Sequence, residues 1–260
     1  MNQKMNKKDA QQLLNKKINR NEKTIRDAIL KLENSIILLA AGIDTKPNGT
    51  IAAPSISLPQ SRAFLRETQK AFNEIYLTEV ETTLDFKDID LLVQKGLQTK
   101  YAGTTSTTLK ALIINDRNFH ESLSSQTQDK LNESVIDHVI NGSEKNDLIL
   151  SIRNILTGIK DAGGRPMSSH AETITQDSLM EYYASASIMT AKQAGIDKFE
   201  YFGTLIKDSR QWCAAHVNEA YTLAEIKQFD DDSWAGKKPG PTIINRGGYN
   251  CRHSWLPIVE

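Results

Sequence analysis

The sequence contains only two cysteines, few aromatic residues and no excess of charge of either sign. Two cysteines in 260 residues cannot build a disulfide scaffold, so we expect synthesis in a reducing cytosol. Lysine plus arginine and aspartate plus glutamate both number 32, which gives a formal net charge of zero. This balance argues against a protein that binds nucleic acid over its whole surface, although a local basic patch stays open.

The sequence also lacks a long hydrophobic run. The best candidate, Ser35–Ala41, is far shorter than the roughly 18 apolar residues that cross a bilayer, so no membrane partner is expected. The basic start, Met1–Lys8, leads into a charged stretch rather than an apolar core, so no secretory signal is expected. Neither a glycine-rich phosphate loop nor a His-Glu-x-x-His motif is present.

Apolar residues in steps of three, four and seven predict one long amphipathic helix from about Lys8 to Ala41. The apolar stripe consists of Leu14, Ile18, Ile25, Ile29, Leu32, Ile36 and Leu39. We expect this stripe to pack within its own bundle or against a coiled-coil partner. A linker with three prolines, Thr45–Pro59, follows the helix.

Further helices are predicted as far as residue 160. In order, they begin at Ser61, cover Asp85–Leu97, run from Thr104–Thr108 to Asn141-Gly142 with a break near Ser124–Gln126, and extend from Ser143 to Leu156. Residues 1–160 are therefore expected to form a helical region for assembly or docking.

A second domain, residues 161–260, is predicted because the stretch Gly163-Gly-Arg-Pro166 is rich in residues that interrupt helices and so marks a boundary. Its expected elements are a helix over Ser168–Ala194, a strand over Phe199–Leu205, a short helix over Asp208–Val217, a loop over Phe229–Gly247 and an extended segment over Tyr249–Val259. The fold class is therefore mostly α, with long N-terminal helices followed by a compact α+β domain that contains a small β-sheet.

Both cysteines and all three tryptophans lie in the last fifty residues, where two Cys/His pairs suggest a metal site. The pair Cys213-x-x-His216 is spaced by one helical turn, and Cys251-x-His253 places two side chains on one side of a strand. Two thiolates and two imidazoles form a ligand set that zinc accepts.

Other interpretations of these residues stay open. The cysteines are also small apolar core residues or partners in a disulfide, and the histidines are also structural hydrogen-bonding groups. A thiol nucleophile at Cys213, activated by His216 or His253, and a histidine-metal nuclease site are further hypotheses.

A set of short motifs marks the C-terminal part of the sequence: Glu172-Thr173, Tyr201-Phe-Gly-Thr204, Asp208-Ser-Arg210, Cys213, His216 and Arg246-Gly-Gly-Tyr-Asn-Cys-Arg-His-Ser-Trp255. Together they resemble the Mu F-like family of phage minor head proteins, which act in head morphogenesis. Many relatives carry cysteine where this chain has His216 and His253, and both replacements keep a residue that can bind metal. The usual arginine before Glu-Thr is replaced by Ala171.

The resemblance implies a structural virion protein without enzymatic activity. It implies a component that is made in the host cytoplasm, forms an oligomer in the phage head or neck, and associates with the portal or the major capsid protein. The implied structural tip adds Asp208, Arg210, Asn250, Arg252 and Trp255 to the four Cys/His residues. Two alternatives are a zinc-dependent or thiol enzyme and a protein that binds packaged DNA and is ejected with it.

Overall fold

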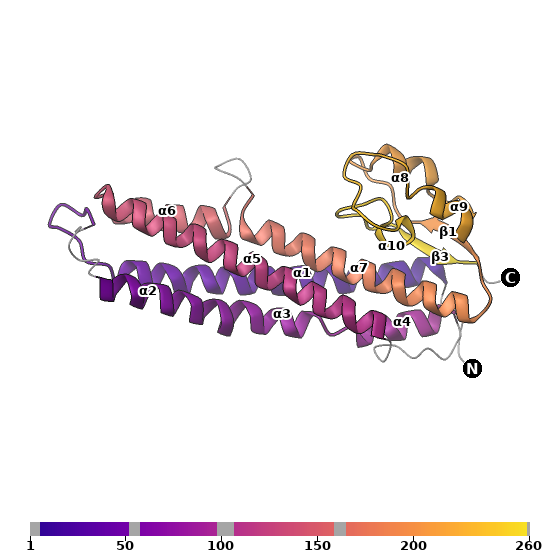
Figure 1. The fold of residues 1–260 in the computed structure, drawn as a ribbon, viewed down its shortest axis with the longest axis horizontal. Coiled ribbons are helices and arrows are strands. Elements are labelled where there is room, and N and C mark those ends of the chain that lie inside the picture. The colour runs from indigo at the N-terminus through magenta and orange to yellow at the C-terminus, as the bar shows by residue number, and fades with distance from the viewer. Residues whose placement is uncertain (1–5, 52–57, 98–106, 159–164, 259–260) are drawn as a thin grey trace. The chain divides into compact units, whose positions relative to one another are not determined.

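Long helices make up most of the chain, and a small antiparallel sheet lies near the C-terminal end of the sequence, which confirms the predicted fold class (Figure 1). The computed structural model describes residues 6–51, 58–97, 107–158 and 165–258. None of the helices in these ranges combines the length and the apolar character that crossing a bilayer requires.

The internal contacts of the chain define two compact units. Unit 1 comprises Met1–Arg20, Asp85–Asn115 and Thr175–Glu260, and unit 2 comprises Asn21–Leu84 and Asp116–Ile174. Each unit thus combines segments that are far apart in the sequence. The domain boundary predicted near Gly163 lies outside the described residues and stays a prediction.

The first helix, α1 (Lys7–Ala41), follows the predicted apolar stripe. Leu14 and Ile18 in unit 1, and Ile25 and Ile29 in unit 2, are fully buried on this stripe. The Asn6 side chain accepts a hydrogen bond from the backbone N–H of Asp9, as a helix-capping side chain does.

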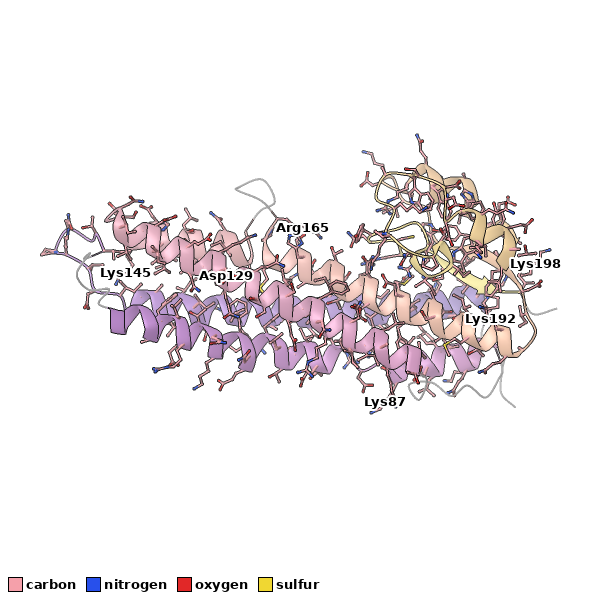
Figure 2. All side chains as sticks on the ribbon, in the orientation of Figure 1. Lys87, Asp129, Lys145, Arg165, Lys192 and Lys198 are labelled. Carbon is pink, nitrogen blue, oxygen red and sulfur yellow. The ribbon has the colours of Figure 1, made fainter. Side chains whose placement is uncertain are left out.

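Unit 2 is built from helices alone apart from isolated β-bridges, among the residues that the structure describes. They are the second half of α1, α2 (Leu58–Ala71), η2 (Phe72–Leu77), α3 (Thr78–Thr83), most of α5 (Thr107–Ile140), α6 (Lys145–Leu156) and the start of α7 (Met167–Gln193). The segment α2–η2–α3 is continuous, and α5 runs without a break through Ser124–Gln126. Lys145, labelled in Figure 2, begins α6 and donates a hydrogen bond to the carbonyl of Ala41.

A buried polar pair joins η2 to α5 inside unit 2. The Tyr76 hydroxyl lies 2.7 Å from Nδ1 of His120, and both side chains are fully buried. Burial lowers the pKa of His120 to about 4, so its imidazole is neutral at pH 7 and Nδ1 can accept the Tyr76 proton.

Unit 1 combines the start of α1 with α4 (Lys87–Leu97), most of α7 and the C-terminal sheet. The ring of Tyr182 on α7 stacks on Phe86 at 4.3 Å, and its hydroxyl donates to Asp90 on α4. This contact ties α7, which precedes the sheet, to α4.

The sheet has three antiparallel strands in the order β2-β1-β3. They are β1 (Lys198–Phe202), which begins at the residue labelled in Figure 2, β2 (Ala220–Thr222) and β3 (Ser254–Pro257). Tyr201 of β1 lies opposite Trp255 of β3, and Phe199 lies opposite Tyr221 of β2. Because side chains alternate along a strand, Phe199 and Tyr201 share one face, and both are fully buried against Ile188 and Ala191.

Short helices fill the connections between the strands. They are α8 (Gln211–His216), α9 (Leu223–Gln228) and α10 (Thr242–Asn245), drawn in orange and yellow beside the sheet in Figure 1. At the start of α9, Thr222 and Glu225 form a reciprocal capping box, a feature that the sequence prediction missed together with β2.

Candidate metal centre

The candidate centre lies where α8 meets the sheet of unit 1. Cys213 comes from α8, Cys251 and His253 come from the segment that enters β3, and Tyr201 comes from the middle strand. Cys213, Cys251 and His253 are 2%, 3% and 6% exposed. Three elements thus deliver these side chains to one buried point.

The ligand atoms of the two cysteines and the histidine are close enough to hold one metal ion. The Cys213 and Cys251 sulfurs and a ring nitrogen of His253 all lie within 4.8 Å of one another, and both cysteines are free thiols. Cys251 Sγ is 3.6 Å from His253 Nδ1, the nitrogen that faces the sulfurs. This buried set can bind a metal ion.

A glycine leaves the space that the cluster occupies. A Cβ atom on Gly247 would lie 2.4 Å from the Cys213 sulfur and 3.0 Å from both the Cys251 sulfur and the Tyr201 hydroxyl. Gly203 does the same for the imidazole, because its Cβ would lie 2.5 Å from Cδ2 of His253. Both glycines therefore allow the backbone to approach the cluster closely.

The fourth predicted ligand, His216, does not join this group. Its Nδ1 lies 2.7 Å from the backbone oxygen of Trp212, and its ring stacks on Trp212 at 4.2 Å. Trp212 in turn stacks on Trp234 at 4.4 Å, and the Lys237 ammonium lies 4.7 Å from the centre of the Trp234 ring. These stacked rings of His216, Trp212 and Trp234, with the Lys237 ammonium over the last ring, are called the aromatic ladder. His216 thus has a structural role within it.

The two thiols differ in acidity because they hydrogen-bond to each other. The hydrogen bond from Cys213 is the largest cause that lowers the pKa of Cys251, and His253, Arg246 and Tyr201 also favour its thiolate against the cost of burial. The same bond, together with burial, raises the pKa of Cys213. Burial is also the main reason that the pKa of Tyr201 is raised. The cluster thus favours one thiolate, and thiolates are the form that binds metal.

Side chains bind the loop around the cluster through its backbone carbonyls. Arg210 donates to the carbonyls of Ala235 at 3.0 Å and Tyr249 at 2.6 Å, and Trp234 Nε1 donates to the carbonyl of Gly247 at 2.9 Å. The Lys237 ammonium donates to three carbonyls, those of Phe229, Asp230 and Asp232. These bonds hold residues 229–249 in place, a segment in which α10 is the only helix.

The segment that carries Cys251 is also held by α7 and α1 within unit 1. Arg252 donates to Gln176 at 2.9 Å and to Asn19 at 2.8 Å, and its own carbonyl accepts a hydrogen bond from Gln11. The backbone N–H of Asn250, which has a left-handed φ of 57°, donates to Asp177 at 3.0 Å.

Burial raises the pKa of Asp177 to about 6. The positive charges of Arg246 and Lys238 and the hydrogen bond from Asn250 oppose this shift without cancelling it. Asp177 is therefore the carboxyl of the site region whose charge changes within a mildly acidic range.

The remaining residues of the predicted tip are placed differently. Trp255 is 1% exposed, and its indole donates to the carbonyl of Thr242. Asp208 is exposed to solvent in the turn before α8. Glu172, from the predicted family motif, belongs to unit 2, where its carboxylate binds Arg26 Nε at 2.6 Å.

The neighbouring Thr173 is held by an arginine that the sequence analysis did not connect with it. Arg165, labelled in Figure 2, donates from one Nη to the Thr173 hydroxyl and to the carbonyl of Ser169. Its spacing of eight residues from Thr173 gives no recognisable sequence signal.

No protein-family model, no curated protein and no solved structure matches this chain. The description of the site therefore depends on its own geometry: two free thiols and an imidazole with one ring nitrogen toward them. Such a donor set suits a borderline-soft cation such as Zn²⁺ better than Ca²⁺ or Mg²⁺, which prefer oxygen ligands.

Proposed function

We propose that the chain is a structural protein of a phage head, a minor head component whose C-terminal domain is held together by a zinc ion. The observation that carries the zinc proposal is the convergence of Cys213, Cys251 and His253 at one buried point. Structural zinc ions are typically held by cysteine and histidine side chains, and their binding contributes directly to the free energy of folding.

The place of the cluster in the fold explains what the ion would stabilise. Cys213 precedes and Cys251 follows the long loop over residues 217–250, so a metal bond between them closes that loop. Only a three-residue strand and two short helices lie in the loop, and they bury few apolar residues. A metal ion would therefore add to the hydrophobic contacts that Ile226, Phe229 and Ile243 of this segment make with the core of unit 1.

Elemental analysis tests the zinc proposal. The full chain is purified under reducing conditions, and we expect about one zinc per chain, a stoichiometry that structural sites show after gentle purification. Cys251→Ser and His253→Ala are expected to lose the metal, whereas the matched control His216→Ala keeps it because His216 lies in the aromatic ladder. Wild-type protein without bound metal would contradict the proposal.

The phage-head role rests on the resemblance of the C-terminal sequence to minor head proteins. The residues that carry this resemblance include Arg210, Cys213, Cys251 and Arg252, and all four take part in the contacts around the cluster. Because these residues lie together around the cluster, the sequence motif is suited to forming the cluster and the loop bonds beside it. We propose a portal or major capsid protein as the partner of the helices.

Mass spectrometry of purified particles tests the virion role. Phage particles from a host that carries this gene are expected to contain the protein at a small fraction of the abundance of the major capsid protein. Chemical cross-linking of the same particles should then join lysines of the helices to portal or capsid peptides. Particles that assemble normally and lack the protein would contradict the role.

A thiol enzyme is the second candidate function, because one observation favours it. Cys251 has a lowered pKa and lies 3.6 Å from an imidazole nitrogen, as a nucleophilic cysteine does. A small alkylating reagent decides between the two functions. A nucleophile reacts at Cys251 rapidly with or without zinc present, whereas a structural ligand is protected until the metal is removed.

A further inference from the structure

Tyr201 places an additional donor atom beside the three residues of the candidate metal centre. Its hydroxyl oxygen lies 3.5 Å from the Cys213 sulfur and 3.3 Å from the Cys251 sulfur. It reaches this point because β1 directs Tyr201 onto the buried face of the sheet. His216, the fourth ligand predicted from spacing, lies elsewhere, and the phenol oxygen of Tyr201 lies beside the cluster instead.

Three donor–donor distances at the centre match the edges of a tetrahedral zinc site. With zinc bonds of about 2.3 Å to sulfur and about 2.0 Å to nitrogen or oxygen, the edges of the tetrahedron measure about 3.3 to 3.8 Å. The two sulfur–oxygen distances are 3.5 and 3.3 Å, and the distance from Cys251 Sγ to His253 Nδ1 is 3.6 Å. The distances from Tyr201 to both sulfurs and from Cys251 to His253 thus have the lengths that binding to one shared ion would require.

Packing holds the phenol in this place. The Tyr201 ring stacks on the His253 ring at 5.2 Å with an interplanar angle of 15°, and Trp255 contacts it at 4.6 Å. Gly247 leaves room for the oxygen, since a Cβ atom there would lie 3.0 Å from it. Preorganised ligands of this kind bind metal without a large cost for ordering their side chains.

A buried positive charge accompanies the site. Two thiolates and a phenolate around Zn²⁺ carry one net negative charge, which is unfavourable in a buried place. The Arg246 side chain is 1% exposed, its charge acts on Cys251, and its Nε has no hydrogen-bond partner among the described residues. The charge of Arg246 also acts on Asp177, so it would offset a part of the negative charge of the ligand set.

We propose that Tyr201 is the fourth ligand of the metal centre and binds zinc through its deprotonated hydroxyl, together with Cys213, Cys251 and His253. This inference rests on the zinc site proposed above and replaces the ligand that sequence spacing assigned to His216. On binding, the phenol proton passes to solvent or buffer and the oxygen–metal bond forms, with no change of oxidation state.

Absorption spectroscopy with the full chain tests the proposal. Zn²⁺ or Co²⁺ is titrated into reduced, metal-free protein, and we expect a tyrosinate difference band that grows with metal and saturates at one equivalent. The Co²⁺ spectrum should also show sulfur charge transfer and the intense visible bands of a four-coordinate ion. Tyr201→Phe should lose the tyrosinate band and weaken zinc binding more than about 100-fold, beyond the effect of an outer-shell partner.

Tyr221→Phe is the matched control, since Tyr221 lies on the neighbouring strand and contacts Trp255 by its ring. This variant should keep the band and the affinity. Wild-type protein that binds zinc without a tyrosinate band would overturn Tyr201 as a ligand and leave the zinc site standing. Wild-type protein that binds neither metal would overturn both. The band of the wild-type protein decides the matter even if Tyr201→Phe fails to fold.

Discussion

Gly247 lies against the side chains of Cys213, Cys251 and Tyr201 at the candidate metal centre. No other residue type fits there, because any Cβ atom would overlap the Cys213 sulfur at 2.4 Å. A side chain at this position must displace either the sulfurs or the loop backbone. The glycine is therefore a requirement of the site itself.

Gly247→Ala is expected to destabilise the protein by about 1 to 3 kcal/mol, the usual cost of overpacking a filled core, and to abolish zinc binding. Chemical denaturation and metal titration measure the two effects. Gly195→Ala is the control, because its Cβ would meet nothing within 4 Å and only the left-handed φ of 72° is unfavourable. A Gly247→Ala variant that binds zinc with wild-type affinity would show that the cluster does not need this space.

Because of Asp177, the stability of unit 1 should change with pH in the mildly acidic range. Its pKa is about 6 in the folded protein against an ordinary 3.8, so the folded state holds the proton more tightly than the unfolded state does. Stability therefore falls as pH rises from about 4 to about 6, by up to about 3 kcal/mol, and the loss is complete above that range. In Asp177→Asn this fall should disappear.

Urea unfolding at several pH values measures the effect of Asp177→Asn. The difference in unfolding free energy between variant and wild type should rise in favour of the variant as pH increases from about 4 to about 6. Asp208→Asn provides a control at an exposed carboxylate. Parallel curves for wild type and Asp177→Asn would show that this carboxyl does not titrate there.

At the scale of single residues, the sequence predicted the three residues of the candidate metal centre, added His216, which lies outside this group, and did not include Tyr201. Cys213, Cys251 and His253 were predicted because their types and spacing indicate metal binding. Spacing also selected His216, but it cannot reveal that the ring stacks on Trp212. Tyr201, the proposed fourth ligand, was not predicted because an inward tyrosine on a strand is an ordinary core residue until its neighbours across the fold are known.

Among the elements, η2 shows how a polar pair fixes one helix against another. Tyr76→Phe should remove the hydrogen bond to His120 and leave a fully buried imidazole without either partner, since Nε2 has none among the described residues. We expect a loss of about 1 to 3 kcal/mol, the cost of an unsatisfied buried polar group. Urea unfolding monitored by circular dichroism measures it.

Tyr221→Phe again supplies the comparison, because Tyr221 is only partly buried and should change stability by less than about 0.5 kcal/mol. Equal effects of the two substitutions would show that the Tyr76–His120 contact contributes nothing specific.

Periodicity predicted the long elements of the chain well. The predicted helix over 8–41 is confirmed as α1 (Lys7–Ala41), and the predicted helix over 168–194 is confirmed as α7 (Met167–Gln193). The short elements β2 and α9 were missed, because three to six residues carry too little periodic signal. The π-helical turn η2 was missed as well, since its apolar spacing is close to that of an α-helix.

At the scale of the whole molecule, metal removal should affect one unit. The three Cys/His residues of the candidate metal centre and the proposed ligand Tyr201 all belong to unit 1, so a chelator is expected to increase hydrogen exchange over residues 198–258. Amides of η2 and α3 in unit 2 should exchange at their original rates. The loss of stability should be about 2.7 kcal/mol where zinc was present at 100 times its dissociation constant.

Hydrogen-exchange mass spectrometry with and without chelator measures this response. His253→Ala is the control, because a protein that binds no zinc should not respond to the chelator. An equal response in both units of the wild type would contradict the local role of the metal.

The division into units was beyond sequence reasoning. A boundary near residue 160 follows from glycine and proline content, but contacts assign Met1–Arg20 and Thr175–Glu260 to the same unit. Such an association depends on side chains that meet across the fold, for example Gln11 with the carbonyl of Arg252. The local sequence around Gln11 or Arg252 does not indicate that these two residues are in contact.

This interleaved order of segments has a consequence for the chain as it leaves the ribosome. Every residue of unit 2 has been made by Ile174, whereas unit 1 still lacks Cys251, His253 and strand β3. Gln11, near the beginning of α1, is separated by 241 positions from Arg252, whose carbonyl it binds. This contact can therefore form only after nearly the whole chain has been synthesised. Unit 2 can fold first, and the apolar face of residues 7–20 stays open to aggregation until the rest of unit 1 has been made.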